Sequence, residues 1–392
     1  MRWIALLVIT AALISMPGAA WAVESEKPVG LLSAEGVLGD VDLSRIEESV
    51  RELNSEIDAA IPDVDFKSLA LSLARGEIGY RPLDVLNSLL RYLFHEVIAN
   101  AALLGKLVVL AVIAAVLHNI SSAFEKSTTS RMAHVTVYLA LLTLALGSFV
   151  AVLQMAREAV ENMVVFMHAM LPVMITLLCA VGGFTSAALL HPVIIIVLNA
   201  SANLVQNIVL PLILFSAILG AVSHLASGFS LSRLADFFRN IGLGIMGMLT
   251  TIFLGMLAIQ GVAGAVAGGV AFRTAKYATG AFVPVVGKMF SDAMEAVIGS
   301  SLLVKNAVGM AGLLVIFLIA IFPLLKIVSL VLIYKLAAAL VQPIGEKQVS
   351  DCLNTLGNSM VAIFAVVATC ALLFFFSLAI IAGMGNLNVM LH

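Results

Sequence analysis

Charged residues are scarce in this chain, since Asp, Glu, Lys and Arg make up only 11% of its 392 residues. A soluble domain is about one quarter charged, so this composition excludes an ordinary water-soluble fold. Cysteine is also rare, with three residues and no Cys-x-x-Cys pair. A disulfide framework or a cysteine zinc site is therefore not expected.

Catalytic and ligand-binding signatures are missing as well. The chain has no Gly-x-Ser-x-Gly and no His-Glu-x-x-His, and its seven histidines are scattered over separate segments. Gly280–Lys288 has the outline of a phosphate loop, but the spacing is wrong and Met289 replaces the Ser or Thr that holds magnesium. No basic patch is interleaved with aromatics, which excludes a nucleic-acid surface. We expect no enzyme activity, no metal and no cofactor.

Long apolar runs dominate what is present. The chain is 62% hydrophobic with a mean hydropathy of +1.12. The runs are continuous rather than alternating, which indicates helices and not a β-barrel. The predicted fold class is all-α: a polytopic membrane protein with seven or eight transmembrane helices and a small N-terminal helical ectodomain.

Residues 1–22 are typical of a secretory signal peptide. Arg2 precedes the short apolar core Ile4–Ile14, and Ala20-Trp21-Ala22 forms an Ala-x-Ala cleavage site. The alternative is an uncleaved first span. Because the core is short and Pro17-Gly18 interrupts it, we favour cleavage after Ala22, which places the mature N-terminus outside the cytoplasm.

Residues 23–97 are predicted to form an acidic helical domain outside the cytoplasm, since positions 23–96 hold 15 acidic and 7 basic residues. Apolar residues three and four apart indicate helices over Asp42–Ile61 and Asp65–Ala74, and a third that starts at Pro82. Local packing explains these stripes better than a dedicated docking surface.

The remainder divides into a hairpin and two repeats. The hairpin, residues 98–163, contains spans Ala99–Leu117 and Met132–Leu153 and an outside connector, Gln154–Asn162. Repeat 1 covers residues 164–270 and repeat 2 covers residues 271–392. Equal spacings suggest an internal duplication of about 110 residues, because Pro172–Pro211 and Pro284–Pro323 are both 39 residues apart and Asp236–Gly242 and Asp351–Gly357 are both six apart. Chance similarity between apolar helices is the alternative.

Repeat 1 is expected to contain the span Val164–Leu190, a turn at His191-Pro192, and an apolar segment, Val193–Val222, that Pro211 divides. Amides gather before this proline, and such groups do not face lipid cheaply. Interhelical hydrogen bonding and a polar cavity lining both remain open for them; the candidate lining residues are Asn199, Asn203, Gln206 and Asn207.

An interfacial helix, Ser230–Asn240, and a span, Ile241–Gly261, complete repeat 1. Counting each long span once places this interfacial helix, with Arg233 and Arg239, outside the cytoplasm, against the positive-inside rule. Splitting 193–222 at Pro211 into two crossings places it inside.

Repeat 2 is expected to hold spans Leu302–Phe322 and Leu324–Val341, a loop over Gln342–Ser359, and a last span that ends at Ala382. Two lysines, Lys305 and Lys335, lie inside or near these apolar helices. A lysine there is costly and invites a functional interpretation, but we expect both to snorkel toward a helix end.

One stretch carries a family resemblance. The sequence FPLLKIVSLVLIYKLAAALVQPIGEKQVSDCLNTLGNSM, with a second block at Phe282–Ser301, resembles the stage III sporulation protein AE family of endospore-forming bacteria. The residues that match the family pattern are Pro323, Lys326, Tyr334, Lys335, Pro343, Gly345, Asp351, Gly357 and Asn358.

The resemblance implies a membrane component of a secretion-like channel apparatus between mother cell and forespore. It implies residence in the outer forespore membrane, an ectodomain in the intermembrane space, and three kinds of partner: a secretion-type ATPase, ring-forming proteins and a forespore-side protein. The alternatives are a scaffold that only recruits ring proteins, and a stand-alone secondary transporter.

Overall fold

The computed structural model describes Gly36 and residues 42–57, 65–76, 82–123, 128–224, 231–256, 286–344 and 347–384. Every regular element in these ranges is helical, which confirms the all-α class. The predicted cleavage residues Ala20 and Ala22 lie outside the described residues. So do the family residue Gly345 and residues 272–285. The domain boundaries stay predictions.

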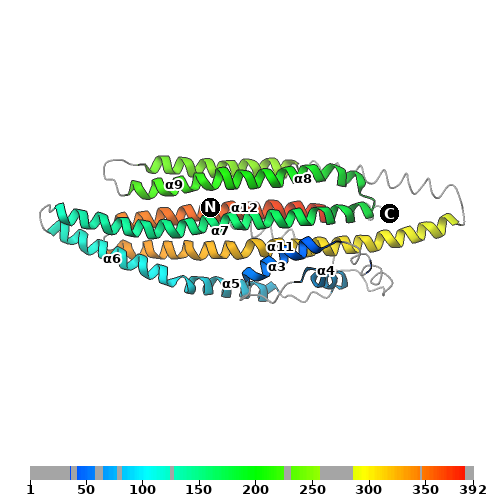
Figure 1. Cartoon of the computed structure of the whole chain (residues 1–392), viewed down its shortest axis with the longest axis horizontal. Coiled ribbons are helices and arrows are strands. Elements are labelled where there is room, and N and C mark those ends of the chain that lie inside the picture. The colour runs from blue at the N-terminus through cyan, green and yellow to red at the C-terminus, as the bar shows by residue number, and fades with distance from the viewer. Residues whose placement is uncertain are drawn as a thin grey trace.

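The α-helices labelled in Figure 1 are α3 (Ser44–Ile57), α4 (Phe66–Arg75), α5 (Pro82–Ala99), α6 (Ala101–Ala123), α7 (Thr128–Ala180), α8 (Phe184–Leu204), α9 (Leu210–Ser223), α11 (Val286–Val341) and α12 (Lys347–Gly383). A π turn, η1 (Val205–Val209), precedes α9, and a 3₁₀ turn, η2 (Gln342–Ile344), follows α11. A further helix, Ser232–Met256, follows α9.

The helices form an elongated bundle. In Figure 1, α7, α11 and α12 run side by side along the long axis, α8 and α9 lie on one side of them, and α3 to α6 lie on the other. α7 and α11 are antiparallel, because Tyr334 contacts Ala145 while Gly312 lies against Met170. The core therefore follows the α7–α11–α12 contact for most of the bundle's length.

Two of these helices are much longer than a bilayer is thick. α7 has 53 residues and α11 has 56, which at about 1.5 Å per residue is about 80 Å each. Among the described residues, five helices are long and apolar enough to cross a membrane, or six if the bent pair Val85–Ala99 and Ala101–Leu117 is one span. The expected seven or eight crossings are not confirmed.

The count differs because predicted breaks are helical. The expected connector Gln154–Asn162 lies inside α7, and Pro172 and Pro323 lie inside α7 and α11 rather than at helix boundaries. A proline removes one backbone hydrogen bond, but neighbouring helices stabilise the turn around it. The predictions of separate spans at these places were wrong.

Three other boundaries also differ. The expected turn at His191-Pro192 lies inside α8, the chain instead turning at Gly182, where φ is +83°. The expected loop Gln342–Ser359 is mostly helix, since α12 begins at Lys347. Ser230–Asn240 does not form a separate interfacial helix but belongs to Ser232–Met256.

The N-terminal helices agree with the sequence. α4 begins after Asp65, whose carboxylate accepts the backbone N–H groups of Lys67 and Ser68, and it ends at Gly76 in the left-handed region, φ +71°. α5 begins at Pro82 as expected. On α3, the N–H and hydroxyl of Ser44 donate to Asp42 and hold the pKa of that carboxyl below its usual value.

Small residues let α11 approach its neighbours closely. A Cβ at Gly309 would lie 2.6 Å from Cβ of Ala382 on α12, and one at Gly312 would lie 2.4 Å from Cε of Met170 on α7. Ala382 is too short to move aside by a change of rotamer. Glycine at 309 is therefore required by the spacing of the two helices.

We expect Gly309→Ala to lower the free energy of unfolding by about 1–3 kcal/mol, because α11 and α12 must separate to admit the methyl group. Gly299→Ala in the same helix is the control, since nothing lies within 4 Å of its added Cβ. Circular dichroism melts of both variants in one detergent measure the difference. Equal melting temperatures would contradict this account of the packing.

Candidate functional site

A lysine with two amide partners lies between α11 and α12. Nζ of Lys335 donates to Oδ1 of Asn354 at 2.6 Å and to Oδ1 of Asn358 at 2.5 Å. The two asparagines are four residues apart, so they share one face of α12. Both amides are exposed and Lys335 is half-buried, which puts this group on the outer surface of the bundle.

Gly357 lies against the lysine stem. A Cβ at this position would lie 3.4 Å from Cε of Lys335 and 3.5 Å from Cβ of Tyr334, which are ordinary van der Waals distances. We refer to Lys335, Asn354, Asn358 and Gly357 as the Lys335 cluster.

Tyr334, the residue before Lys335, reaches α7 with its hydroxyl group. Its hydroxyl donates to the carbonyl of Ala145 at 2.7 Å and also contacts the hydroxyl of Ser148, both on α7. The ring is completely buried. Adjacent residues thus attach α11 to two different neighbours, Tyr334 to α7 and Lys335 to α12.

The same part of α12 also contacts α9. The hydroxyl of Thr355 lies 3.1 Å from Nε2 of His224, and a Cβ at Gly220 would lie 2.6 Å from the Thr355 methyl group. Tyr138 of α7 donates to the carbonyl of Ala221 at 3.1 Å. One layer of polar contacts therefore joins α7, α9, α11 and α12.

The predicted polar lining lies on the outside of the bundle. Asn199, Asn203 and Asn207 are exposed, and Gln206 is half-buried. The asparagines form a chain of contacts along the helix, with Asn203 Nδ2 on the Asn199 carbonyl at 3.0 Å and Asn207 Nδ2 on Oδ1 of Asn203 at 3.2 Å. These amides face away from the bundle core, so any path that they line lies between this chain and a neighbour.

α7 supplies the other half of this polar surface. His168 Nε2 lies 3.3 Å from Oδ1 of Asn199, and Arg157 donates to the carbonyl of Gln206 at 3.4 Å. That carbonyl belongs to the π turn just before Pro211, where the proline ring disrupts regular helical bonding. We call Arg157, His168 and the three asparagines the α7–α8 polar stripe.

Lys305 is in a different place from that predicted. Its side chain is completely buried, and Nζ donates to the carbonyls of Ala382, at 2.9 Å, and of Met384. These carbonyls are at the C-terminal end of α12, where helical partners run out and positive charge is favoured. Snorkelling was therefore the wrong prediction for Lys305, which instead caps a neighbouring helix. For Lys335 it stays a prediction, since the ammonium group bonds to two exposed amides six residues before the end of α11.

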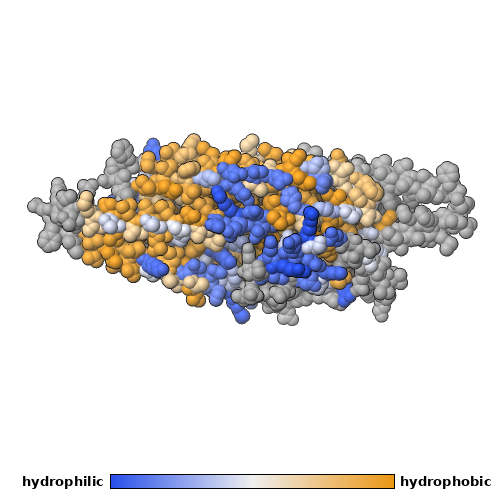
Figure 2. Space-filling model, in the orientation of Figure 1, coloured by the Kyte–Doolittle hydropathy of each residue, from blue (hydrophilic) through white to orange (hydrophobic). Residues whose placement is uncertain are grey.

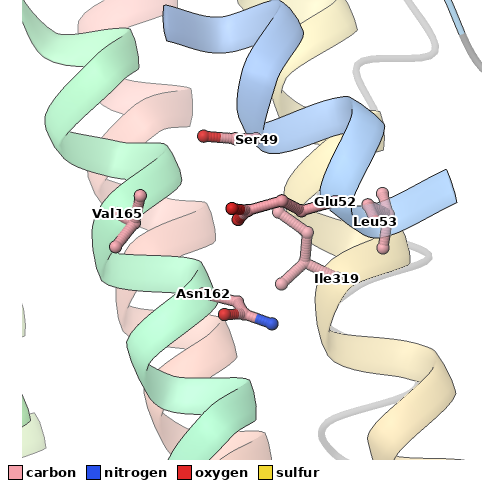
Figure 3. A pocket seen from close by; sticks show the side chains of 6 residues that line it. All are labelled: Ser49, Glu52, Leu53, Asn162, Val165 and Ile319. Carbon is pink, nitrogen blue, oxygen red and sulfur yellow. The ribbon is translucent and has the colours of Figure 1, made fainter. Parts of the chain in front are cut away.

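A small pocket with a volume of about 10 Å³ lies where α3 meets the bundle (Figure 3). Glu52 and Ser49 line it from α3, Asn162 and Val165 from α7, and Ile319 from α11. Its shallow, mixed lining carries no chemistry of its own. Its lining residues show where the acidic helix α3 packs along the length of α7 and α11.

Comparisons with known proteins were made for the whole chain. The family model described as stage III sporulation protein AE matches residues 64–385. The chain belongs to this family. It is also 40% identical to stage III sporulation protein AE of Bacillus subtilis (strain 168), over all of this chain and 99% of that relative. No solved structure matches the chain.

Membership of this family gives the protein a role in sporulation. Its matching motif residues within the described part occupy four places. Pro323 and Lys326 lie in α11, Pro343 lies exposed in η2, and Asp351 lies in the second turn of α12. The remaining four, Tyr334, Lys335, Gly357 and Asn358, come together at the Lys335 cluster.

Several members of the polar layer were not predicted from the sequence. Asn354, Ser148, His224 and Thr355 have no signal of their own, because single polar residues are frequent in apolar helices. Asn354 was the one that could have been found, since it precedes Asn358 by one helical turn.

Removal of the amides tests the Lys335 cluster. We expect the double variant Asn354→Leu, Asn358→Leu to lose about 1–3 kcal/mol of stability, because Nζ of Lys335 loses both acceptors. Adding Lys335→Met should restore most of the loss, since an apolar set then replaces the complete polar set. Circular dichroism melts in detergent measure all three proteins. A triple variant as unstable as the double variant would show that the lysine is not the reason.

Proposed function

We propose that the protein is a multi-pass membrane component of a secretion-like apparatus that connects mother cell and forespore. The observation that carries this proposal is the full-length match to the stage III sporulation protein AE of Bacillus subtilis (strain 168). The protein would reside in the outer forespore membrane with its acidic N-terminal helices in the intermembrane space. Its partners would be a secretion-type ATPase, ring-forming proteins and a forespore-side protein.

Two polar surfaces support a role in a conduit. The Lys335 cluster and the α7–α8 polar stripe both lie on the outside of a strongly apolar bundle. An ammonium group and rows of amides are best satisfied by water or by polar groups of another protein chain. A water-filled path between chains would provide such contacts.

A scaffold is the second candidate, and two observations favour it. The amides of the polar stripe already bond to one another and to α7, so stability alone can explain them. The charged faces of α3 and α4 also suit protein partners. The stand-alone transporter rests on the internal duplication that the sequence suggests. Substrate uptake by the purified protein in liposomes would support that third candidate.

Replacing the stripe's asparagines distinguishes conduit from scaffold. We expect Asn199→Leu, Asn203→Leu, Asn207→Leu to reach the membrane at normal levels but to reduce heat-resistant spores by an order of magnitude or more. Asn240→Leu is the matched control, an exposed amide away from the stripe. Membrane immunoblots and spore counts provide the two measurements. Normal sporulation by the triple variant would favour the scaffold.

A further inference from the structure

We propose that one bilayer surrounds only part of the bundle, from the turns after His224 and Val341 to the level of Arg157, and that the rest stands outside the membrane. Helix length requires such a division. The apolar span on α7 has 46 residues and that on α11 has 47, so each is about 70 Å long. A hydrocarbon core is about 30 Å thick, which is about 20 residues of helix.

A charged level marks the outer boundary. α7 exposes Gln154, Arg157, Glu158 and Glu161 within about two turns. Arg157 donates to the carbonyl of Gln206, so it lies at the same height along the bundle as the π turn before α9. On α11 this level lies near Pro323, because Arg157 and Pro323 are both about midway between the Tyr334–Ala145 and Gly312–Met170 contacts.

The acidic helices identify which side of that level is in water. α3 buries Ile46 and Val50 against the bundle, while Glu48 and Arg51 are exposed on its outer face. Its pocket residues place α3 beside Asn162 and Ile319, beyond the charged level (Figure 3). Figure 2 shows this hydrophilic patch over the middle of the bundle, with a hydrophobic surface on the left. A helix with a charged outer face does not lie in hydrocarbon.

The other boundary follows from counting residues. About 20 residues before Arg157, α7 reaches Val137. About as far from the charged level, α11 reaches its end at Val341 and α9 ends before His224. The ends of α9 and α11 therefore coincide with the second face of one slab of bilayer thickness, and Arg233 and Lys347 follow at the start of the next helices. The end of α6 at Ala123 and the start of α7 at Thr128 extend past this face, and Lys126 lies between them in the sequence.

This placement agrees with the positive-inside rule. The basic residues near all three turns lie at one end, which is then cytoplasmic. α7 leaves the cytoplasm once, α8 stays outside, and α9 returns, so Ser232 begins its helix on the cytoplasmic side without any extra crossing. The conflict that the sequence posed at Arg233 and Arg239 disappears. The extramembrane half comprises the end of α7, all of α8, the start of α11 and the end of α12.

Two threonines on α7 provide a matched test. Thr143 lies in the proposed membrane half and Thr176 in the other; both are exposed, and both donate to the carbonyl four residues earlier at 2.8 Å. Thr143→Cys and Thr176→Cys are made in the full chain after replacement of Cys179, Cys352 and Cys370 by Ala. Each is spin-labelled in liposomes, and collision with oxygen and with a nickel chelate is measured.

We expect the ratio of oxygen to nickel collision to be several-fold higher at position 143 than at position 176. Low collision with both reagents at 176 also supports the proposal, because it indicates protein contact rather than lipid. A ratio at 176 as high as at 143 would overturn it, as would strong nickel access at 143.

Brominated lipids give an independent measurement. The only tryptophans, Trp3 and Trp21, lie in the predicted signal peptide, so Thr143→Trp and Thr176→Trp each report on one site. Brominated acyl chains should quench the fluorescence at 143 and leave that at 176 unchanged. Equal quenching at both positions would place both in lipid and refute the proposed boundary.

Discussion

A backbone polar group that is buried away from water must find a hydrogen-bond partner, in lipid and inside a packed helix bundle alike. Each peptide group must bond within its own helix or to a neighbour. The helices therefore continue through Pro172 and Pro323 instead of breaking there. Where a helix does end inside the protein, a side chain replaces the missing partner, as Lys305 does for the last carbonyls of α12.

Close packing between α7, α11 and α12 depends on small residues and on hydrogen bonds between helices. Gly309 and Gly312 let α11 approach both neighbours. Tyr334 and Lys335 then bind one neighbour each, through a carbonyl of α7 and two amides of α12. The family motif is concentrated at this junction, which connects the sporulation role to the integrity of the bundle.

Local signals predicted the parts of the fold that depend on neighbouring residues alone. The ends of α4 follow from Asp65 and Gly76, and the start of α5 follows from Pro82. In the apolar region, prolines and charged residues did not predict the helix ends. Tertiary contacts there stabilise helices across residues that would end a helix in water. Arg157 and its neighbours looked like a connector, yet they lie in mid-α7. In the candidate site, the sequence predicted which amides and lysines are important, but it did not predict the groups to which they hydrogen-bond.

By itself, the sequence determined the all-α membrane class, the acidic N-terminal helices and the family, because composition, periodicity and motif residues are properties of the chain alone. Only the tertiary structure decided how long each helix runs and which polar groups meet. Lys335 finds Asn354 and Asn358 only when two antiparallel helices pack face to face. Such partners are set by the register between helices, and register depends on the shapes of both surfaces together.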